Sequence, residues 1–263
     1  MQWILSGDFN QYLPFFNSFQ GKAFQKEFEH SALLHALSGG ARTTLTECRR
    51  SDAALFGFYS SLIEGGSRHH LSLPELLQEA RQLYHPSKAA GFLPGTNLAP
   101  ANFVISHRKR EMLNAACNNA DAQGRKGVEE FKMADYFGEE ELNNLSHSDN
   151  QPQDALFWPG MVVVAKSTGR KIKNALPCEI LGFTEKTVVV APSAGEGREA
   201  LELKKAHFFK SMRLQYALTF ASIQGTTVKT LVALHDTNHP HFGRRKLFVG
   251  SSRAVANDKL IVY

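Results

Sequence analysis

The sequence predicts an α/β protein: a parallel sheet flanked by helices, interrupted by a small antiparallel β-barrel insertion. Residues 103–105 form a short apolar strand, and a helix from about residue 108 to residue 119 follows it directly. This strand-then-helix step is typical of parallel α/β structure. From residue 160 to about residue 203 the chain changes to short β-runs, which are typical of a small antiparallel sheet or barrel. From residue 212 the α/β alternation resumes, so we expect one domain that carries an insertion.

The elements before this domain follow from local signals. Gly39 and Gly40 end a helical pattern, Ser51 or Asp52 can cap the next helix, and Pro74 suits the first turn of another. The expected order is a strand at 3–6, a helix at 24–37, a strand at 42–46, and helices at 52–63 and 74–84.

The remaining elements are expected from apolar runs separated by Pro, Gly and Asn. Residues 86–102 are a loop, and the polar residues 121–154 are a loop or an insertion boundary. The expected strands are 161–165, 178–183, 187–191, 214–220, 231–234 and 260–262, with helices from residue 224 and over 246–253.

Composition narrows the class of protein. Of the 263 residues, 43% are hydrophobic and 21% are charged, so an ordered globular chain is expected rather than a disordered one. A net charge of +5 suits a phosphate-bearing partner without requiring one. Three dispersed cysteines without a CxxC pair argue against a disulfide framework and favour an intracellular location.

No apolar run reaches the roughly 18 residues of a membrane span. The first residues have no basic stretch typical of a signal peptide, and a strand that begins at once suggests a truncated chain.

Two clusters in the N-terminal quarter place polar groups after strands. Gly7, Asp8 and Gln11 follow the strand 3–6, where ligands bind in open α/β folds; an ordinary strand-ending turn is the alternative. Arg50 follows the strand 42–46 and has a planar fork of donors suited to phosphate. A solvated helix start with a salt bridge to Asp52 is the alternative for this cluster.

Two further clusters lie near the C-terminus. The strand 214–220 leads through Ser222, Gln224, Gly225, Thr226 and Thr227 into an expected helix N-terminus, which favours anions. The hydroxyl groups of this segment suit contacts to a DNA backbone that do not read its sequence.

The fourth cluster is an apolar helix that ends in small residues and Arg253. That arginine suits the neutralisation of charge on a transferring phosphoryl group. A surface arginine without such a role is the alternative reading.

Taken in order, the four clusters resemble motifs III, IV, V and VI of superfamily-one DNA helicases, closest to the RecD-like branch that includes the Pif helicases. Motif III is matched by Gly7, Asp8, Gln11 and Pro14, with Tyr12 as an extra residue; motif IV by Leu45, Arg50 and Ser51; motif V by Tyr216, Ala217, Thr219, Gln224, Gly225 and Thr227; and motif VI by Leu247, Phe248, Val249, Ser252, Arg253 and Ala254. Residues 157–190 resemble the barrel insertion of that family.

The resemblance implies two RecA-like domains. Residues 1–65 would be the tail of the first, residues 66–124 and 211–263 would form the second, and residues 125–210 would be the insertion. It also implies roles: Gln11, Arg50 and Arg253 would act on the phosphates, and Gly7, Asp8, Gln224 and Gly225 would line the nucleotide. Single-stranded DNA would contact His107, Ser222, Thr226 and Thr227. Ala221 and Ser222 replace a His-Lys pair of the family, which puts DNA affinity at this point in doubt.

Two motifs of the family are missing from these residues. There is no GxxxxGK[ST] loop, because Gly21-Lys22 is followed by Ala23, and there is no Asp-Glu dipeptide. ATP and Mg²⁺ are therefore expected to bind the intact enzyme and not this chain alone, which is expected to lack ATPase activity. The missing N-terminal RecA-like segment of the same protein is thus an expected partner.

Two alternatives to this function remain open. The chain could serve as the helicase subunit of a recombination nuclease, or as a non-catalytic nucleic-acid-binding remnant of a helicase. His235, Asp236, His239 and His241 resemble a zinc-binding cluster, but they lie in a loop without a nearby cysteine. A solvated loop is favoured there, and no metal site is expected.

Overall fold

The structure, a computed structural model, describes residues 18–19, 22–23, 32–41, 43, 47–90, 98–144, 151–166, 176–193 and 199–263. The strand expected at residues 3–6 lies outside them, as does most of the helix expected at 24–37. The helices are α1 (Ala32–Leu37), α2 (Ala53–Ser60), α3 (Leu73–Leu83), α4 (His107–Ala122), α5 (Met133–Tyr136), α6 (Glu139–Asn143), α7 (Lys205–Ser211) and α8 (Arg244–Ser251). The strands are β1 (Ser18–Phe19), β2 (Lys22–Ala23), β3 (Ala101–Val104), β4 (Glu129–Phe131), β5 (Ala155–Phe157), β6 (Val162–Ala165), β7 (Pro177–Phe183), β8 (Thr187–Pro192), β9 (Leu201–Lys204), β10 (Met212–Arg213), β11 (Ala217–Thr219), β12 (Val232–Leu234) and β13 (Leu260–Val262).

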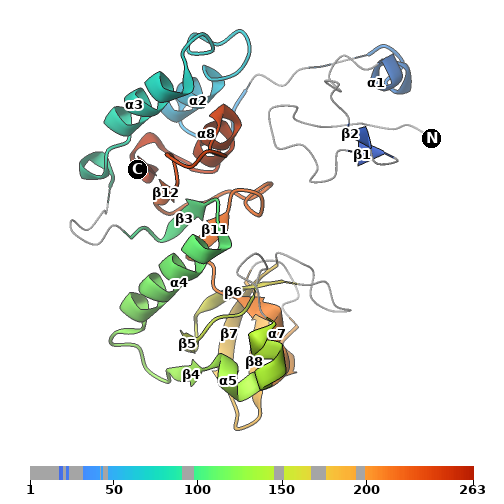
Figure 1. The fold of residues 1–263 in the computed structure, drawn as a ribbon, viewed down its shortest axis with the longest axis vertical. Coiled ribbons are helices and arrows are strands. Elements are labelled where there is room, and N and C mark those ends of the chain that lie inside the picture. Colours follow the sequence, from blue (N-terminus) through green and yellow to red (C-terminus); the bar gives the residue numbers. More distant parts are fainter. Residues whose placement is uncertain are drawn as a thin grey trace.

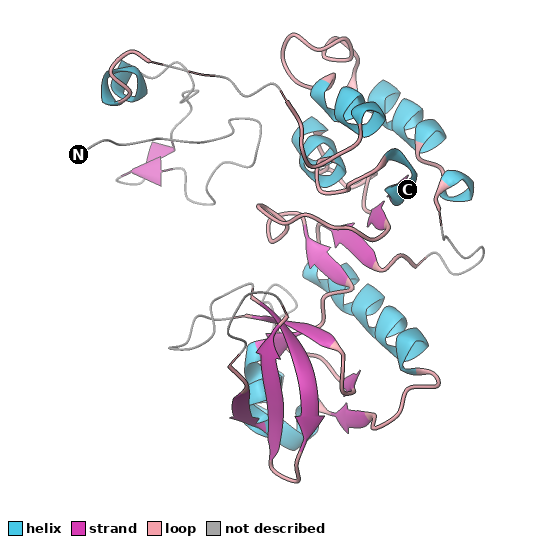
Figure 2. Cartoon of the chain, turned by 180° about the vertical axis from the view of Figure 1, so that it is seen from behind, coloured by secondary structure: helices cyan, strands magenta, loops and turns pink. Residues whose placement is uncertain are grey.

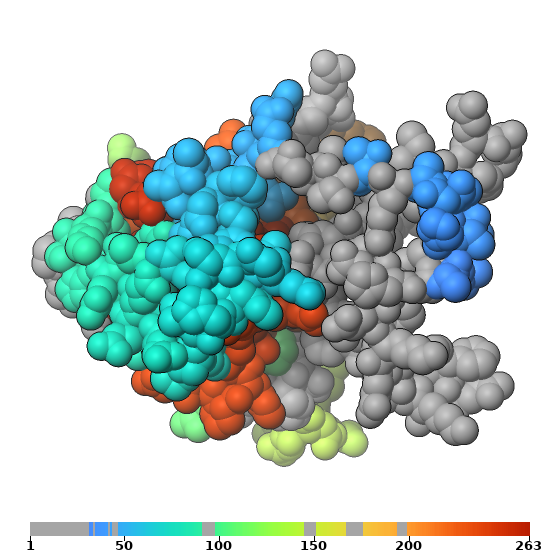
Figure 3. Space-filling view, turned by 90° about the horizontal axis from the view of Figure 1, so that it is seen from above, coloured from blue at the N-terminus to red at the C-terminus, as the bar shows by residue number. Residues whose placement is uncertain are grey.

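A four-stranded parallel sheet in the order β11-β3-β12-β13 confirms the predicted α/β fold. Alternate side chains of its strands point to opposite faces. Phe103 and Leu234 pack with helices α2, α3 and α8 on one face, whereas Val104 packs with Leu113 of α4 on the other. Figure 1 shows α2, α3 and α8 on one side of the sheet and α4 on the other side. Seen from above, α2 and α3 lie together with the C-terminal segment on one face of the molecule (Figure 3).

Helices α2 and α3 begin where the sequence predicts, α2 after a cap at Asp52 and α3 with Pro74 in its first turn. Asp52 is the N-cap of α2, and its Oδ1 accepts a hydrogen bond from the Leu55 amide at 2.8 Å. Ser72 caps α3, and the Glu75 carboxylate accepts from the Ser72 amide at 2.8 Å, which forms a capping box. The expected domain boundary at residue 65 falls between these two helices, which share one hydrophobic core.

The insertion contains an antiparallel sheet of five strands in the order β10-β6-β7-β8-β9 (Figure 2). Strands β9 and β10 occupy its two edges, so the expected barrel is not confirmed as a closed one in the described residues. The antiparallel pair of β4 and β5 and the helices α5, α6 and α7 were not expected from the sequence. Phe131, Phe157 and Phe208 pack edge to face within this core, which holds the small elements against the sheet.

Two asparagines of α4 join the parallel sheet to the insertion. Asn114 donates to the Ala217 carbonyl at 3.2 Å and accepts from the Ala217 amide at 2.8 Å. Asn118 makes the same pair of bonds with Leu156 of β5, both at 2.8 Å. Each asparagine side chain thus makes the pair of backbone hydrogen bonds that a neighbouring strand would otherwise make. At the other edge of the parallel sheet, the Val262 amide donates to the Tyr84 carbonyl at 3.0 Å.

The helix expected from Gln224 is wrong, because residues 221–225 form turns and no helix begins there. Gly225 has a φ of +80°, a left-handed conformation that ends the turn. The β-branched residues that follow favour extended backbone, and Val228 forms a parallel bridge with Ala254. The expected anion site at a helix N-terminus is therefore absent from this segment as the structure describes it.

Candidate nucleotide and DNA interface

Residues 252–257 form a strap that the segment around Arg50 contacts along its length. The Arg50 Nη1 donates to the Ser252 carbonyl at 3.2 Å, and the Ser51 hydroxyl donates to the Ala254 carbonyl at 2.9 Å. The Asp52 amide donates to the Val255 carbonyl at 3.0 Å, and the Asp52 Oδ2 accepts from the Asn257 amide at 2.7 Å. Residues 50–52 and the strap thus form one structural unit, although about 200 residues of sequence separate them.

Arg253 lies in the middle of this strap with a side chain that is almost entirely buried, at 1% exposed. Its Nε donates to the Val249 carbonyl at 3.1 Å, and its Nη2 donates to the Ser252 hydroxyl at 2.9 Å. Its Nη1 donates to the Thr226 carbonyl at 3.3 Å. The alternative reading of Arg253 as a surface arginine is therefore wrong, because the guanidinium is held inside the protein by oxygen atoms that satisfy its donors.

The segment after β11 reaches the same strap from the other side. The Val228 amide donates to the Arg253 carbonyl at 2.9 Å, which complements the bond from Arg253 to Thr226. The segment is locally ordered, since the Thr226 hydroxyl donates to the Ile223 carbonyl at 2.7 Å and the Ser222 hydroxyl to the Thr219 carbonyl at 2.9 Å. Ser222, Gln224, Gly225 and Thr227 are exposed. Three clusters singled out from the sequence therefore converge on residues 252–254.

The carboxyl ends of the parallel strands place further polar groups on one edge of the sheet. His107 follows β3 and begins α4, whose N-cap Ser106 accepts from the Lys109 amide. Ser222 follows β11, the neighbour of β3, so the two expected DNA contacts lie on the same edge. Asp236 follows β12 with a φ of +58°; it accepts from the Ile105 amide at 2.9 Å and pairs with Lys109 Nζ at 2.7 Å. Burial raises the pKa of the Asp236 carboxyl, but the hydrogen bonds from Lys109 and the Ile105 amide, together with the nearby positive charge, outweigh it, and the net pKa is lowered.

His235 lies beneath this edge and is not a surface ligand. Its Nε2 lies 2.9 Å from Oδ1 of the buried Asn102, and its ring stacks on Tyr263 with centroids 4.8 Å apart. Burial lowers the pKa of His235 to about 4, and the nearby Lys109 cation acts in the same direction. Among the described residues no group of three or more His, Cys, Asp or Glu side chains is placed to hold a metal ion.

Three expected site residues, Gly7, Asp8 and Gln11, lie outside the residues that the structure describes. Their convergence with Arg50 and Arg253 therefore stays a prediction. No sequence motif marks Asn102, Asn114 or Lys109, which hold the sheet and its polar edge in place. Their position on the inward side of a strand or helix was the one available signal.

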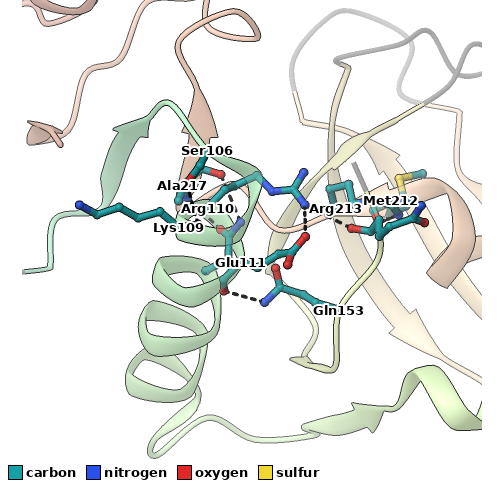
Figure 4. Close-up of polar contacts among 10 residues, drawn as sticks. Ser106, Lys109, Arg110, Glu111, Gln153, Met212, Arg213 and Ala217 are labelled. Atoms are coloured by element: carbon teal, nitrogen blue, oxygen red, sulfur yellow. Dashed lines mark hydrogen bonds and ion pairs between the residues drawn. The ribbon is translucent and has the colours of Figure 1, made fainter. Parts of the chain in front are cut away.

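A junction between α4 and the insertion carries two buried arginines (Figure 4). Arg110 pairs with Glu111 at 3.0 Å, and Arg213 Nη1 donates to the Lys210 carbonyl at 3.0 Å. Burial lowers the pKa of Arg213 to about 10, and Arg110 contributes as a like charge. Gln153, which lies just before β5, donates to the Glu111 carbonyl of α4 at 3.0 Å and so adds a further bond between α4 and the insertion. These contacts are explained by packing of the insertion on α4.

Comparison with solved structures identifies the fold. The chain is similar to the Pif1 helicase from Candida albicans, with a TM-score of 0.54 and 16% identity over 97% of this chain and 63% of that one. It is similar to Bacteroides Pif1 bound to ssDNA, with a TM-score of 0.51 and 14% identity over 84% of this chain and 51% of that one. A Bacteroides Pif1 complex with ADP-AlF3 and ssDNA gives a TM-score of 0.50 and 14% identity over 97% of this chain and 60% of that one.

These likenesses confirm the expected Pif-like α/β fold. The chain spans between about half and just under two thirds of the length of these structures. No family model and no curated protein matches the sequence. No helix among the described residues is long and apolar enough to cross a membrane.

Proposed function

We propose that this chain is the part of an ATP-dependent DNA motor that brings two arginines to the phosphates of the nucleotide and contacts single-stranded DNA. The observation that carries the proposal is the convergence of residues 50–52, 226–228 and 252–254 on one strap. Structures with this fold include Pif1 helicases bound to ssDNA and to ADP-AlF3. Fold alone does not define an activity, so the proposal depends on these side chains.

Arg50 and Arg253 suit the phosphate side of this function. A guanidinium stays charged at any physiological pH and offers several donors in a fixed plane, which matches the oxygens of a phosphate. In the described structure both arginines donate to backbone carbonyls, Arg50 to Ser252 and Arg253 to Val249 and Thr226. We propose that both exchange these neutral acceptors for phosphate oxygens when the nucleotide is present, with Gln11, Gly7, Asp8, Gln224 and Gly225 completing the nucleotide site.

The exposed hydroxyls after β11 suit the DNA side. Ser222 and Thr227 are exposed and Thr226 is half-buried, on the edge of the sheet where His107 begins α4. Hydroxyl groups bond to phosphate and sugar oxygens without reading the bases. We propose that a strand crosses this edge, with weak preference for sequence. The bond between Arg253 and the Thr226 carbonyl then joins the DNA side to the phosphate side directly.

The 263 residues contain no P-loop and no Asp-Glu pair. These groups supply the phosphate cradle and the magnesium ligands in P-loop enzymes. We propose that an additional RecA-like segment of the same protein supplies them, and that ATP and Mg²⁺ bind between that segment and this chain. The free thiols of Cys48, Cys117 and Cys178 agree with the proposed intracellular location.

The test joins this chain to a segment that carries a P-loop and an Asp-Glu pair, and measures ATP hydrolysis. Arg253→Ala is expected to lower kcat by at least about a thousandfold, because arginine fingers contribute that much to phosphoryl transfer. DNA binding is expected to persist. Arg245→Ala is the matched control, because Arg245 is an exposed arginine of α8, the helix that precedes Arg253, and should leave kcat unchanged. Equal turnover in the two variants would remove Arg253 from the phosphate site.

A second candidate is a nucleic-acid-binding protein without ATPase activity. It is favoured by Ala221 and Ser222, which leave the exposed turn after β11 without a cation at these two positions. The same joined protein separates the two candidates: ATP hydrolysis stimulated by single-stranded DNA supports the motor, and DNA binding without hydrolysis supports the binding protein. A helicase subunit of a recombination nuclease remains compatible with the motor.

A further inference from the structure

Ser252 contacts both of the arginines that the proposed function assigns to the phosphates. Its carbonyl accepts from Arg50 Nη1 at 3.2 Å. Its hydroxyl accepts from Arg253 Nη2 at 2.9 Å and from Arg253 Nε at 3.3 Å. One residue therefore holds two guanidinium groups that come from positions 203 residues apart in the chain.

The backbone and the hydroxyl of Ser252 are themselves fixed. Ser252 is the C-cap of α8, where the carbonyl end of the helix favours cations. Its amide donates to the Phe248 carbonyl at 2.9 Å, and its hydroxyl donates to the Val249 carbonyl at 3.0 Å. Because the hydroxyl proton is used in this bond, the oxygen presents its lone pairs to Arg253. The hydroxyl is thus oriented as an acceptor.

The neighbouring serine provides an internal comparison. Ser251 is 0% exposed and Ser252 is 4% exposed, so both hydroxyls are buried at the end of the same helix. The Ser251 hydroxyl has no hydrogen-bond partner among the described residues, whereas the Ser252 hydroxyl makes three hydrogen bonds. Burial alone therefore does not account for the contacts of Ser252.

We propose that Ser252 is a positioning residue that sets the separation and direction of Arg50 and Arg253 toward the phosphate chain of a nucleoside triphosphate. This inference rests on the proposed function of the two arginines. The Ser252 carbonyl limits the directions that the Arg50 guanidinium can take. The Ser252 hydroxyl holds Nε and Nη2 of Arg253, while Nη1 remains able to exchange the Thr226 carbonyl for a phosphate oxygen. Fixed donors of this kind stabilise charge as it develops in the transition state.

The experiment compares Ser252→Ala with Ser251→Ala in the joined protein described above. Ser252→Ala is expected to lower kcat by about tenfold and to leave KM for ATP nearly unchanged, because the lost bond orients a group that acts in the transition state. Ser251→Ala is expected to keep the wild-type kcat. Thermal unfolding of both variants is measured alongside. Ser252→Cys replaces the hydroxyl by a slightly larger and weaker acceptor, so a kcat between those of the wild type and Ser252→Ala is expected; this variant tests the proposal if the alanine variant folds poorly.

A second measurement uses this chain alone and does not depend on hydrolysis. The ¹⁵N resonance of Arg253 Nε is expected to move in Ser252→Ala and to stay in place in Ser251→Ala. If the joined wild-type protein hydrolyses ATP and the two alanine variants turn over equally, the positioning role is overturned while the proposed function stands. If the wild-type protein does not hydrolyse ATP, the proposed function fails. The resonance then decides whether Ser252 holds Arg253, and an unchanged resonance overturns the inference.

Discussion

His235 shows what a single buried titratable side chain does to this fold. The ring is 6% exposed, lies 2.9 Å from Asn102 Oδ1 and stacks on Tyr263, so it is stable in the neutral form. Protonation would place a cation in this interior next to Lys109, which explains why the pKa falls to about 4. The unfolded chain binds the same proton with a pKa of about 6.5.

This difference predicts a pH dependence of stability. The folded pKa lies below the unfolded one, so the contribution of His235 is complete above about pH 6.5 and is lost as pH falls toward 4. The loss is on the order of 3 kcal/mol for a shift of this size. Urea unfolding of the wild type and of His235→Phe, which retains the stacking on Tyr263, measures it between these pH values. A wild-type slope no steeper than that of the variant would contradict the assignment.

Helix α8 shows how an element is fitted closely onto the sheet. A Cβ at Gly250 would lie 2.8 Å from Leu234 Cδ2 and 2.9 Å from Phe220 Cε1, which are closer than real contacts allow. Both neighbouring side chains are buried in the core and have little room to move. The glycine therefore permits the approach of α8 to β11 and β12, and it does so by its small size and not by a special backbone conformation.

Gly250→Ala is expected to lower the free energy of unfolding by about 1–3 kcal/mol, as overpacking of a core does. Gly57→Ala is the matched control, because Gly57 is an exposed glycine inside α2 with nothing within 4 Å of an added Cβ. There the better helix propensity of alanine should raise stability by about 0.5–1 kcal/mol. Chemical denaturation of both variants gives opposite signs. A stabilised Gly250→Ala variant would show that α8 does not pack as described.

At the scale of elements, residues close in sequence predicted where two helices begin. Asp52 caps α2 because its side chain accepts a hydrogen bond from an early amide of that helix, and Pro74 lies in the first turn of α3. Residues 224–230 were assigned wrongly because Gly225 and the β-branched run after it favour a turn and an extended segment that pairs with Ala254. That pairing, like the burial of Arg253, depends on residues distant in sequence and has no local signal. Strand β4 and helices α5 and α6 were missed because they lie in the polar stretch 121–154, whose few aromatic residues find their packing partners only in three dimensions.

At the scale of the whole molecule, the net charge and the attachment of the insertion to α4 set how the chain meets its proposed partner. The net charge is +5, and two asparagines of α4 bind the parallel sheet and strand β5 of the insertion, so the polar edge and the insertion are held together. Single-stranded DNA binding by this chain is therefore expected to be weak, electrostatic and indifferent to base sequence. Filter binding with two unrelated oligonucleotides should show equal affinities that fall as salt rises, with a slope of about 0.7 per phosphate contact on logarithmic axes. Strong preference for one oligonucleotide, or affinity unaffected by salt, would contradict this expectation.

Both edge strands of the parallel sheet have a backbone amide that is bonded within the chain, and this affects how copies of the chain associate in solution. The partner is the Asn114 side chain at β11 and the Tyr84 carbonyl at β13. Exposed strand edges invite another polypeptide to pair with them, which is a common route to aggregation. Here the outward amides of Ala217 and Val262 are already bonded, one at each margin of the parallel sheet. A foreign strand would have to displace a helix side chain on one margin or a helix terminus on the other. These two bonds are therefore expected to disfavour self-association by strand pairing at the edges of the parallel sheet.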